Sequence, residues 1–335
     1  MVSLNKHSIF ACLLFLSFWG CSQKEYFKPL EVNGKVSFTS KLPSKIIETN
    51  KSGAVLDNSQ ILSKDGLSTF ELQEGEAFIG FSNGVYLVSS HCNDLRFYDE
   101  KGSITKTFKL PACPVSASIS ENQLALVSNE NTIYLYDIPS QKEIFSKKSN
   151  SAIAVNSMLQ APVFFGDMIY YPMLDGSVMI VSKKSLEVEK TIVIDSAPFF
   201  NNVIFLQVSP NVTLLATAKK MLSLYGSNTY SYDAEIRDIK IFGNLIYITT
   251  LDGTIQELDF TLKPLRTLKF QFANFSAINI TNGFLSVLES GSGYLIKVDL
   301  KNFSPKVYKI GISREENVFS QGNKLYYEKD ILEFK

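Results

Sequence analysis

The sequence predicts an all-β protein, a β-propeller of eight four-stranded antiparallel blades, and a recurring turn is the main reason. Its clearest copy is the stretch from Gly243 to Asp259, in which two apolar runs flank Asp252 and Gly253. Asp-Gly between β-branched runs predicts a tight type I′ hairpin, because Gly tolerates a positive φ and Asp accepts one. Seven weaker copies accompany it, and no helical stripe interrupts them.

The turns define the repeat length. They are marked by Asn58, Asp94, Asn131, Asp175, Lys219, Asp252, Ser292 and Lys329. Their spacing runs from 33 to 44 residues and averages about 39, and a period near 40 with only strands between the turns is typical of propeller blades. Because the first and fifth turns are weak, seven blades is the alternative.

Four strands can be assigned within a period. For residues 161–194 we expect them at 162–165, 168–173, 177–182 and 187–194, and in the next period at 199–207, 214–218, 221–225 and 229–234. Runs such as residues 245–248 are apolar without strict alternation, as expected when both faces of a sheet pack against neighbours. Packing between blades should therefore form the core.

The end of the chain lacks one strand. Residues 316–320 and the hairpin at 324–334 supply three strands, after which the sequence stops. Residues 35–41 have no partner of their own, so we expect them to close the ring as the missing outer strand. Closure removes the exposed sheet edges, and residues 34–335 form one propeller domain.

The N-terminus predicts export and lipidation. Lys6 precedes an apolar run over residues 9–19, which is shorter than the roughly 20 residues that span a bilayer. Gly20-Cys21 then resembles a bacterial lipobox, in which the Cys is acylated after residues 1–20 are removed as a signal peptide. Lipidation at Cys21 is the prediction, residues 21–33 are the lipidated tether, and ordinary secretion with a free Cys21 thiol is the alternative.

The residue after the Cys indicates the membrane. Ser22 stands where an Asp would resemble an inner-membrane retention signal of enteric bacteria. We therefore expect an outer-membrane protein that is lipid-anchored and faces the periplasm. Each buried CH₂ of an acyl chain contributes about 0.8 kcal/mol, so two or more chains make a stable anchor.

Composition argues against several functions. The 33 basic and 33 acidic residues include no long run of one sign, so nucleic acid is not an expected partner. His91 is the sole histidine after the signal peptide, which argues against a metal site, and we expect it in a loop or at the end of a strand. The turn carboxylates of Asp94, Asp175 and Asp252 are explained by turn geometry. We expect no enzyme, no cofactor and no metal.

Two cysteines remain besides Cys21. Cys92 and Cys113 form an even pair in an oxidising compartment, and we predict a disulfide between them. Closing a loop of this length would stabilise the fold by about 3 kcal/mol. The alternative is two buried thiols on neighbouring strands.

Aromatic pairs are expected in the core. Phe164-Phe165, Phe199-Phe200 and Tyr326-Tyr327 are predicted at blade interfaces. Tyr230 and Tyr232 are the candidates for anchoring a protein partner from a loop.

One repeat resembles a known family. Residues 161–182, with a Pro, an apolar pair, a turn, a Tyr-bearing strand, Asp-Gly and a strand, resemble the repeat of quinoprotein-like propellers. Cys113-Pro114-Val115 and Ala197-Pro198-Phe199 repeat its opening. Enzymes of this superfamily stack pyrroloquinoline quinone on tryptophan; the sequence has no tryptophan after Trp19, so the resemblance implies no quinone cofactor.

A lipobox followed by eight such blades resembles the BamB family of lipoproteins. The resemblance implies a protein-binding scaffold whose partner is the outer-membrane barrel-assembly translocase. The sequence departs from typical members in being shorter and in lacking their blade tryptophans. A ligand-binding envelope lipoprotein that holds a glycan or peptide, without a role in barrel assembly, is the alternative.

Overall fold

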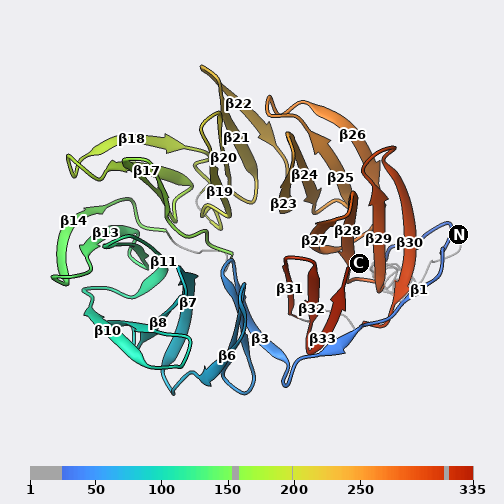
Figure 1. Cartoon of the computed structure of the whole chain (residues 1–335). Helices are drawn as coiled ribbons and strands as arrows, with labels where there is room; N and C mark the ends of the chain where they lie inside the picture. Colours follow the sequence, from blue (N-terminus) through green and yellow to red (C-terminus); the bar gives the residue numbers. More distant parts are fainter. Residues whose placement is uncertain (1–24, 153–157, 198, 313–316, 335) are drawn as a thin grey trace, which may run out of the picture.

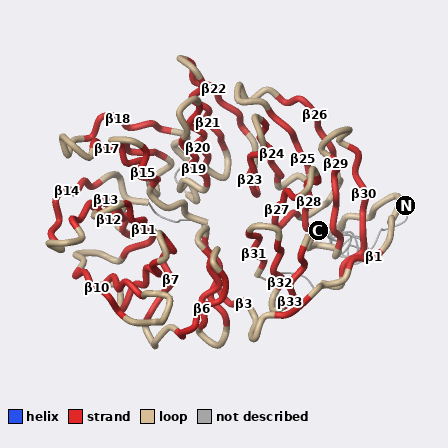
Figure 2. Tube along the Cα trace, in the orientation of Figure 1, coloured by secondary structure: helices blue, strands red, loops and turns tan. Residues whose placement is uncertain are grey.

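Strands are the only regular secondary structure in the computed structural model, which describes residues 25–152, 158–197, 199–312 and 317–334. They form eight separate sheets, which stand side by side around a common axis (Figure 1). Figure 2 shows these strands joined by turns and loops. The structure is an eight-bladed β-propeller. The eight-blade prediction is thus confirmed, and the seven-blade alternative is wrong.

Each blade is an antiparallel sheet whose first strand lies nearest the axis. Blade 1 contains β3 (Ile46–Asn50), β4 (Gly53–Leu56), β5 (Gln60–Ser63) and β6 (Gly66–Glu71); blade 2 contains β7 (Glu76–Ser82), β8 (Val85–Ser90), β9 (Asp94–Tyr98) and β10 (Ile104–Lys109). Blade 3 contains β11 (Pro114–Ser120), β12 (Gln123–Ser128), β13 (Thr132–Asp137) and β14 (Lys142–Lys148); blade 4 contains β15 (Val163–Phe165), β16 (Met168–Pro172), β17 (Ser177–Ser182) and β18 (Val188–Val193).

The second half of the ring repeats this order. Blade 5 contains β19 (Phe205–Val208), β20 (Val212–Ala216), β21 (Lys220–Tyr225) and β22 (Asn228–Asp233); blade 6 contains β23 (Ile236–Phe242), β24 (Leu245–Thr250), β25 (Thr254–Leu258) and β26 (Pro264–Lys269). Blade 7 contains β27 (Phe275–Thr281), β28 (Phe284–Glu289), β29 (Tyr294–Asp299) and β30 (Ser304–Ile310); blade 8 contains β31 (Val318–Gln321), β32 (Lys324–Tyr327) and β33 (Asp330–Glu333).

The ring is closed by a shorter strand than the sequence predicts. Within residues 35–41, only β2 (Ser40–Lys41) pairs with β33 and completes blade 8. The preceding β1 (Lys35–Val36) pairs in parallel with β30 and adds a fifth strand to blade 7. The segment predicted as one closing strand therefore divides between two blades, because it must cross from the outer edge of one to the outer edge of the next.

The recurring turns lie between the second and third strands of all eight blades, as predicted, but the type I′ assignment is wrong. The Gly253 amide donates a hydrogen bond to the Thr250 carbonyl (3.1 Å), and only Gly253, at φ 80°, has a positive φ in this loop. The loop therefore has three residues, with glycine in the left-handed position. Hydroxyls of Thr250 and Thr254 donate to the Asp252 carboxylate and favour this longer loop.

The core lies between blades, and both faces of each sheet contribute to it. Ile246, Tyr247 and Ile248 are all buried, which confirms the prediction for residues 245–248. Clusters of buried apolar side chains join adjacent blades, as between blades 6 and 7, where Tyr247 packs with residues such as Ile278. The twisted sheets thus stabilise one another through apolar burial.

The aromatic pairs differ in burial. Tyr326-Tyr327 is buried, and Phe164-Phe165 is half-buried. The prediction for Phe199-Phe200 is wrong, because their side chains are 50% and 56% exposed. Strand β19 begins only at Phe205, so the Phe199-Phe200 pair lies in the connection between blades 4 and 5 and has no neighbouring sheet to cover it.

Candidate binding surfaces

The ring has two faces that differ in which turns form them. Because successive strands of a blade alternate in direction, turns from first to second and from third to fourth strands share one face, here called the lower face. The other turns and the connections between blades form the upper face. Loops on a rigid β scaffold are where binding residues usually lie, so each face is a candidate surface.

The turn carboxylates of the upper face serve their own turns. Each accepts hydrogen bonds from nearby side chains: Asp94 from Lys109, Asp175 from Ser149 and Ser177, and Asp252 from Thr250, Thr254 and Lys269. Burial alone would raise the pKa of Asp252, but the hydrogen bonds from Lys269, Thr250 and Thr254 lower it to about 2. These carboxylates are structural, and the structure does not bring them together.

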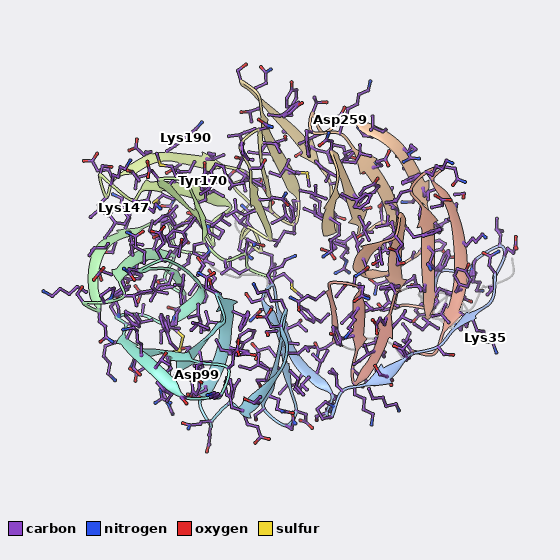
Figure 3. The ribbon with its side chains drawn as sticks, in the orientation of Figure 1. Lys35, Asp99, Lys147, Tyr170, Lys190 and Asp259 are labelled. Atoms are coloured by element: carbon purple, nitrogen blue, oxygen red, sulfur yellow. A yellow bond between two sulfur atoms is a disulfide. The ribbon has the colours of Figure 1, made fainter. Side chains whose placement is uncertain are left out.

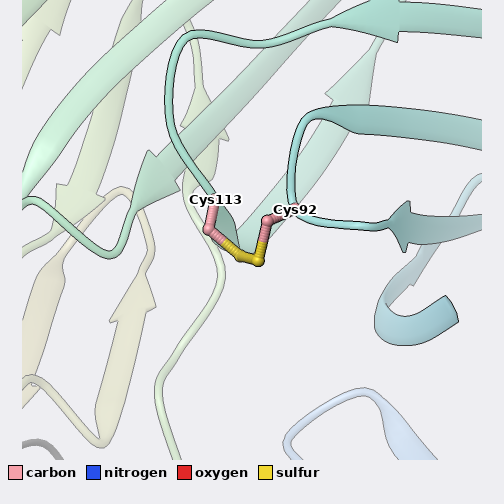
Figure 4. The surroundings of a disulfide bond; sticks show 2 residues. All are labelled: Cys92 and Cys113. Atoms are coloured by element: carbon pink, nitrogen blue, oxygen red, sulfur yellow. A yellow bond between two sulfur atoms is a disulfide. The ribbon is translucent and has the colours of Figure 1, made fainter. Parts of the chain in front are cut away.

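Cys92 and Cys113 are joined by a disulfide, with their Cα atoms 4.2 Å apart (Figure 4). The bond connects the turn between β8 and β9 to the residue that precedes β11, and so links blades 2 and 3. His91 lies in the same turn with a φ of 48°, and its Nδ1 is 3.2 Å from the Ser90 hydroxyl. His91 is a loop residue, as expected.

The predicted lipidation site, Cys21, lies outside the part of the chain that the structure describes. Within the described part of the chain, no group of three or more His, Cys, Asp and Glu side chains could hold a metal ion. A helix long and apolar enough to cross a membrane is likewise missing from that part.

A groove of about 890 Å³ opens on the lower face between blades 5 and 6; we call it the lower-face groove. Tyr225, Tyr230 and Phe260 line it, and the rings of Tyr225 and Phe260 are 5.7 Å apart. Phe242, half exposed, ends the first strand of blade 6 on this face. Exposed aromatic rings beside polar turn atoms are typical of surfaces that bind proteins.

The two tyrosines predicted as loop anchors both lie on β22, not in a loop. Tyr230 lines the lower-face groove. Tyr232 instead donates its hydroxyl to Gln256 of blade 6 (2.6 Å) and helps to hold the two blades together. Only Tyr230 of this pair therefore faces a candidate binding site.

A second cavity, of about 530 Å³, lies at the centre of the ring and is called the central cavity. Residues of blades 1, 5, 6, 7 and 8 line it, including Lys51, Lys219, Arg237 and Glu235. Three cationic groups outnumber two carboxylates, Glu235 in the lining and Asp238 beside Lys51, and this excess favours an acidic ligand. No local sequence pattern indicates this cluster, because its residues come from blades far apart in the chain.

Two of the basic residues that line the central cavity contact polar or acidic side chains. The Lys51 Nζ lies 3.9 Å from the Asp238 carboxylate, which also accepts the Ile278 amide (3.2 Å). Burial lowers the pKa of Lys51, while Asp238 opposes this shift. Burial also lowers the pKa of Arg237, which donates to Asn274 (3.3 Å).

The chain is similar in sequence to two plasminogen-binding proteins. No family model matches it. Two plasminogen-binding proteins PgbB, from Helicobacter pylori strain J99 and from a second H. pylori strain, are 29% and 28% identical to it. Both matches cover 99% of this chain, and 72% and 71% of the relatives.

Solved structures share its architecture. BamB from Moraxella catarrhalis matches with a TM-score of 0.67 and 11% identity, over 89% of this chain and 99% of that one. The C-terminal WD40 domain of Sif2 matches with a TM-score of 0.66 and 13% identity, over 91% and 99%. The chain therefore has a BamB-like propeller fold.

Proposed function

We propose that the chain is a lipid-anchored propeller of the bacterial outer membrane, facing the periplasm, that binds protein partners and catalyses no reaction. The observation that carries this proposal is the similarity, over 99% of the chain, to two proteins named for binding plasminogen. The Gly20-Cys21 pattern supports the anchor. The lower-face groove, lined by Tyr225, Tyr230 and Phe260, supports binding of a partner.

The lower-face groove is the proposed contact surface, and plasminogen is the partner to test first. Tyr225 is 40% exposed, and its neighbour Phe260 packs beside it. Aromatic residues on a rigid turn lose little conformational entropy on binding and often dominate the binding free energy.

Surface plasmon resonance on the immobilised mature chain tests this surface. We expect the double variant Tyr225→Ala, Phe260→Ala to weaken plasminogen binding at least about tenfold, since each truncated anchor costs more than about 1 kcal/mol. The matched control is Phe199→Ala, Phe200→Ala, which removes two exposed rings from the upper face. Equal loss in both variants, or no binding by the parent chain, would contradict the proposal.

The outer-membrane barrel-inserting translocase is the alternative partner. Its support is the lipobox-like N-terminus together with the BamB-like fold. Tagged mature protein from gently solubilised envelopes should then co-purify the translocase, and the Tyr225→Ala, Phe260→Ala variant should not. Absence of the translocase under these conditions argues against a role in barrel assembly.

The central cavity supports a second function, binding of an acidic glycan or peptide. The observation that favours this function is the presence of Lys51, Lys219 and Arg237 in the lining of the central cavity, which has a volume of about 530 Å³. Acidic oligosaccharides and Glu-rich peptides should raise the unfolding temperature of the parent chain but not of Arg237→Gln. A shift that persists in Arg237→Gln would locate the ligand elsewhere.

A further inference from the structure

The N-terminal segment 25–36, here called the strap, is docked along blades 6 and 7. Phe27 is 6% exposed, and its ring meets Phe270 and Tyr294 edge to face at 5.8 and 5.6 Å. The amide of Asn33 donates to the Val307 carbonyl (2.7 Å), and the Val307 amide donates back to Asn33 Oδ1 (2.8 Å). The described part of the predicted tether is therefore fixed to the propeller.

This docking shortens the connection to the predicted anchor. Only six residue steps separate Phe27 from Cys21. A fully extended chain of that length spans at most about 20 Å. If Cys21 is acylated, Phe27 and the edge of the ring around it must lie within this distance of the membrane surface.

The edge around the strap is apolar and carries more lysines than acids; we call it the membrane edge and define it by Leu30, Val32, Phe272, Lys28 and Lys35. Leu30 is fully exposed, and Val32 and Phe272 are 46% and 47% exposed. One cavity here is lined by Lys28, Leu30, Lys269 and Phe270, with Glu31 as its acidic residue. Exposed apolar side chains among lysines suit the interface of a bilayer with anionic lipids.

The position of this edge in the ring is plain in the figures. The first described residues and β1 lie at the outer rim beside β30, on the opposite side from β10 and β14 (Figure 1). Figure 3 shows Lys35 at this rim, and Lys147 and Lys190 at the far rim.

We propose that the strap and the membrane edge hold the propeller against a phospholipid bilayer where its outer rim meets the upper face, with Leu30, Val32 and Phe272 in the headgroup layer. The proposal rests on the lipid anchor of the proposed function. Phe272 lies in the connection between blades 6 and 7, so the contact includes this corner of the upper face. The lower-face groove then lies on the face away from the bilayer contact, accessible to partners.

Tryptophan fluorescence tests this orientation. Trp19, in the predicted signal peptide, is the only tryptophan of the sequence, so a tryptophan introduced into the mature chain reports alone. The probe is Phe272→Trp, and the matched control is Ile104→Trp, whose parent side chain is 45% exposed on β10. Each chain carries Cys21→Ser and an N-terminal hexahistidine, which binds vesicles through a nickel-chelating lipid and replaces the acyl anchor.

Vesicles of phosphatidylethanolamine and phosphatidylglycerol with brominated acyl chains supply the quencher. We expect Phe272→Trp emission to be quenched and shifted to the blue, with Ile104→Trp unchanged. Adding Phe27→Ala releases the strap and should abolish the quenching of Phe272→Trp, while thermal unfolding shows that the propeller stays folded. Equal quenching at both probes, no quenching at Phe272→Trp, or quenching that survives Phe27→Ala would overturn the proposal.

The two proposals can fail separately. Mass spectrometry of native protein from membranes reports whether Cys21 carries acyl chains. Lack of acylation would refute the proposed anchor, whereas the vesicle experiment uses a substitute anchor and tests the membrane edge by itself.

Discussion

The turn at Gly253 offers a strict test of how a single glycine supports the propeller. A Cβ atom at Gly253 would lie 2.2 Å from the Phe270 carbonyl oxygen. Gly243, in a turn of the same blade, is the matched control, because a Cβ there meets nothing within 4 Å. Both residues have a positive φ, 80° and 60°.

The expected costs follow from these two features. A left-handed backbone costs alanine about 1–2 kcal/mol, and the stiffer unfolded chain returns about 0.4–1 kcal/mol, so Gly243→Ala should destabilise by about 1 kcal/mol. At Gly253 the Phe270 carbonyl cannot retreat easily, because the Phe270 amide donates to the Gly253 carbonyl (2.8 Å) and its ring packs on Phe27 and Phe275. Overpacking adds about 1–3 kcal/mol, giving about 2–4 kcal/mol in all.

Urea unfolding at 25 °C, followed by circular dichroism, measures both free energies of unfolding. The slope of unfolding free energy against urea concentration should be the same in both variants, so that their urea midpoints can be compared directly. Equal destabilisation by Gly243→Ala and Gly253→Ala would refute the reasoning, because it would mean that the close approach to Phe270 carries no cost.

Three further predictions concern bonds within the ring. Replacing Cys92 and Cys113 by serine should lower the free energy of unfolding by about 3 kcal/mol. A reductant should lower the stability of the parent chain but not of this double variant. An unchanged urea midpoint would contradict a stabilising disulfide. The buried Glu257 accepts a hydrogen bond from Arg266 Nε (2.8 Å). Arg266→Leu should lower the free energy of unfolding by about 3–5 kcal/mol, because it leaves the Glu257 charge buried and unpaired. The double variant Glu257→Leu, Arg266→Leu should lower it much less, as measured by thermal and urea unfolding. Equal losses in the two variants would argue against the cost of a buried unpaired charge. The lowered pKa of Asp252 means that its ion pair stabilises the fold above the ordinary carboxyl pKa and that this is lost as the pH falls toward about 2. Because the carboxylate is 62% exposed, the loss of stability in acid that Asp252 causes should be under about 1 kcal/mol and should be missing in Asp252→Asn. Identical plots of unfolding free energy against pH for the parent and the variant would refute this prediction.

Much of the fold could be predicted because its signals are local. The turns at Asp175 and Asp252 depend on nearby side chains, and Asp252 is held by Thr250 and Thr254 in its own loop. Apolar runs between such turns identified the strands of blade 4 to within two residues. The candidate site is less predictable: the sequence indicates Tyr230 as a binding residue, but it carries no signal for Tyr225 and Phe260, which line the same groove.

Other features depend on contacts between distant residues. Whether Phe199 and Phe200 are buried depends on where β19 begins to pair, which no local pattern fixes. Division of residues 35–41 between two blades depends on the edges of β30 and β33.

The sequence by itself determined the four-stranded repeat, the order of its strands and the positions of its turns, because turn chemistry and strand pattern act over a few residues. The choice of eight blades over seven came from the structure. Only the tertiary structure brought Lys51, Lys219 and Arg237 around one cavity and fixed Phe27 against Phe270. These contacts join residues up to about 240 positions apart, and closure of the ring, rather than any local preference, decides which of them meet.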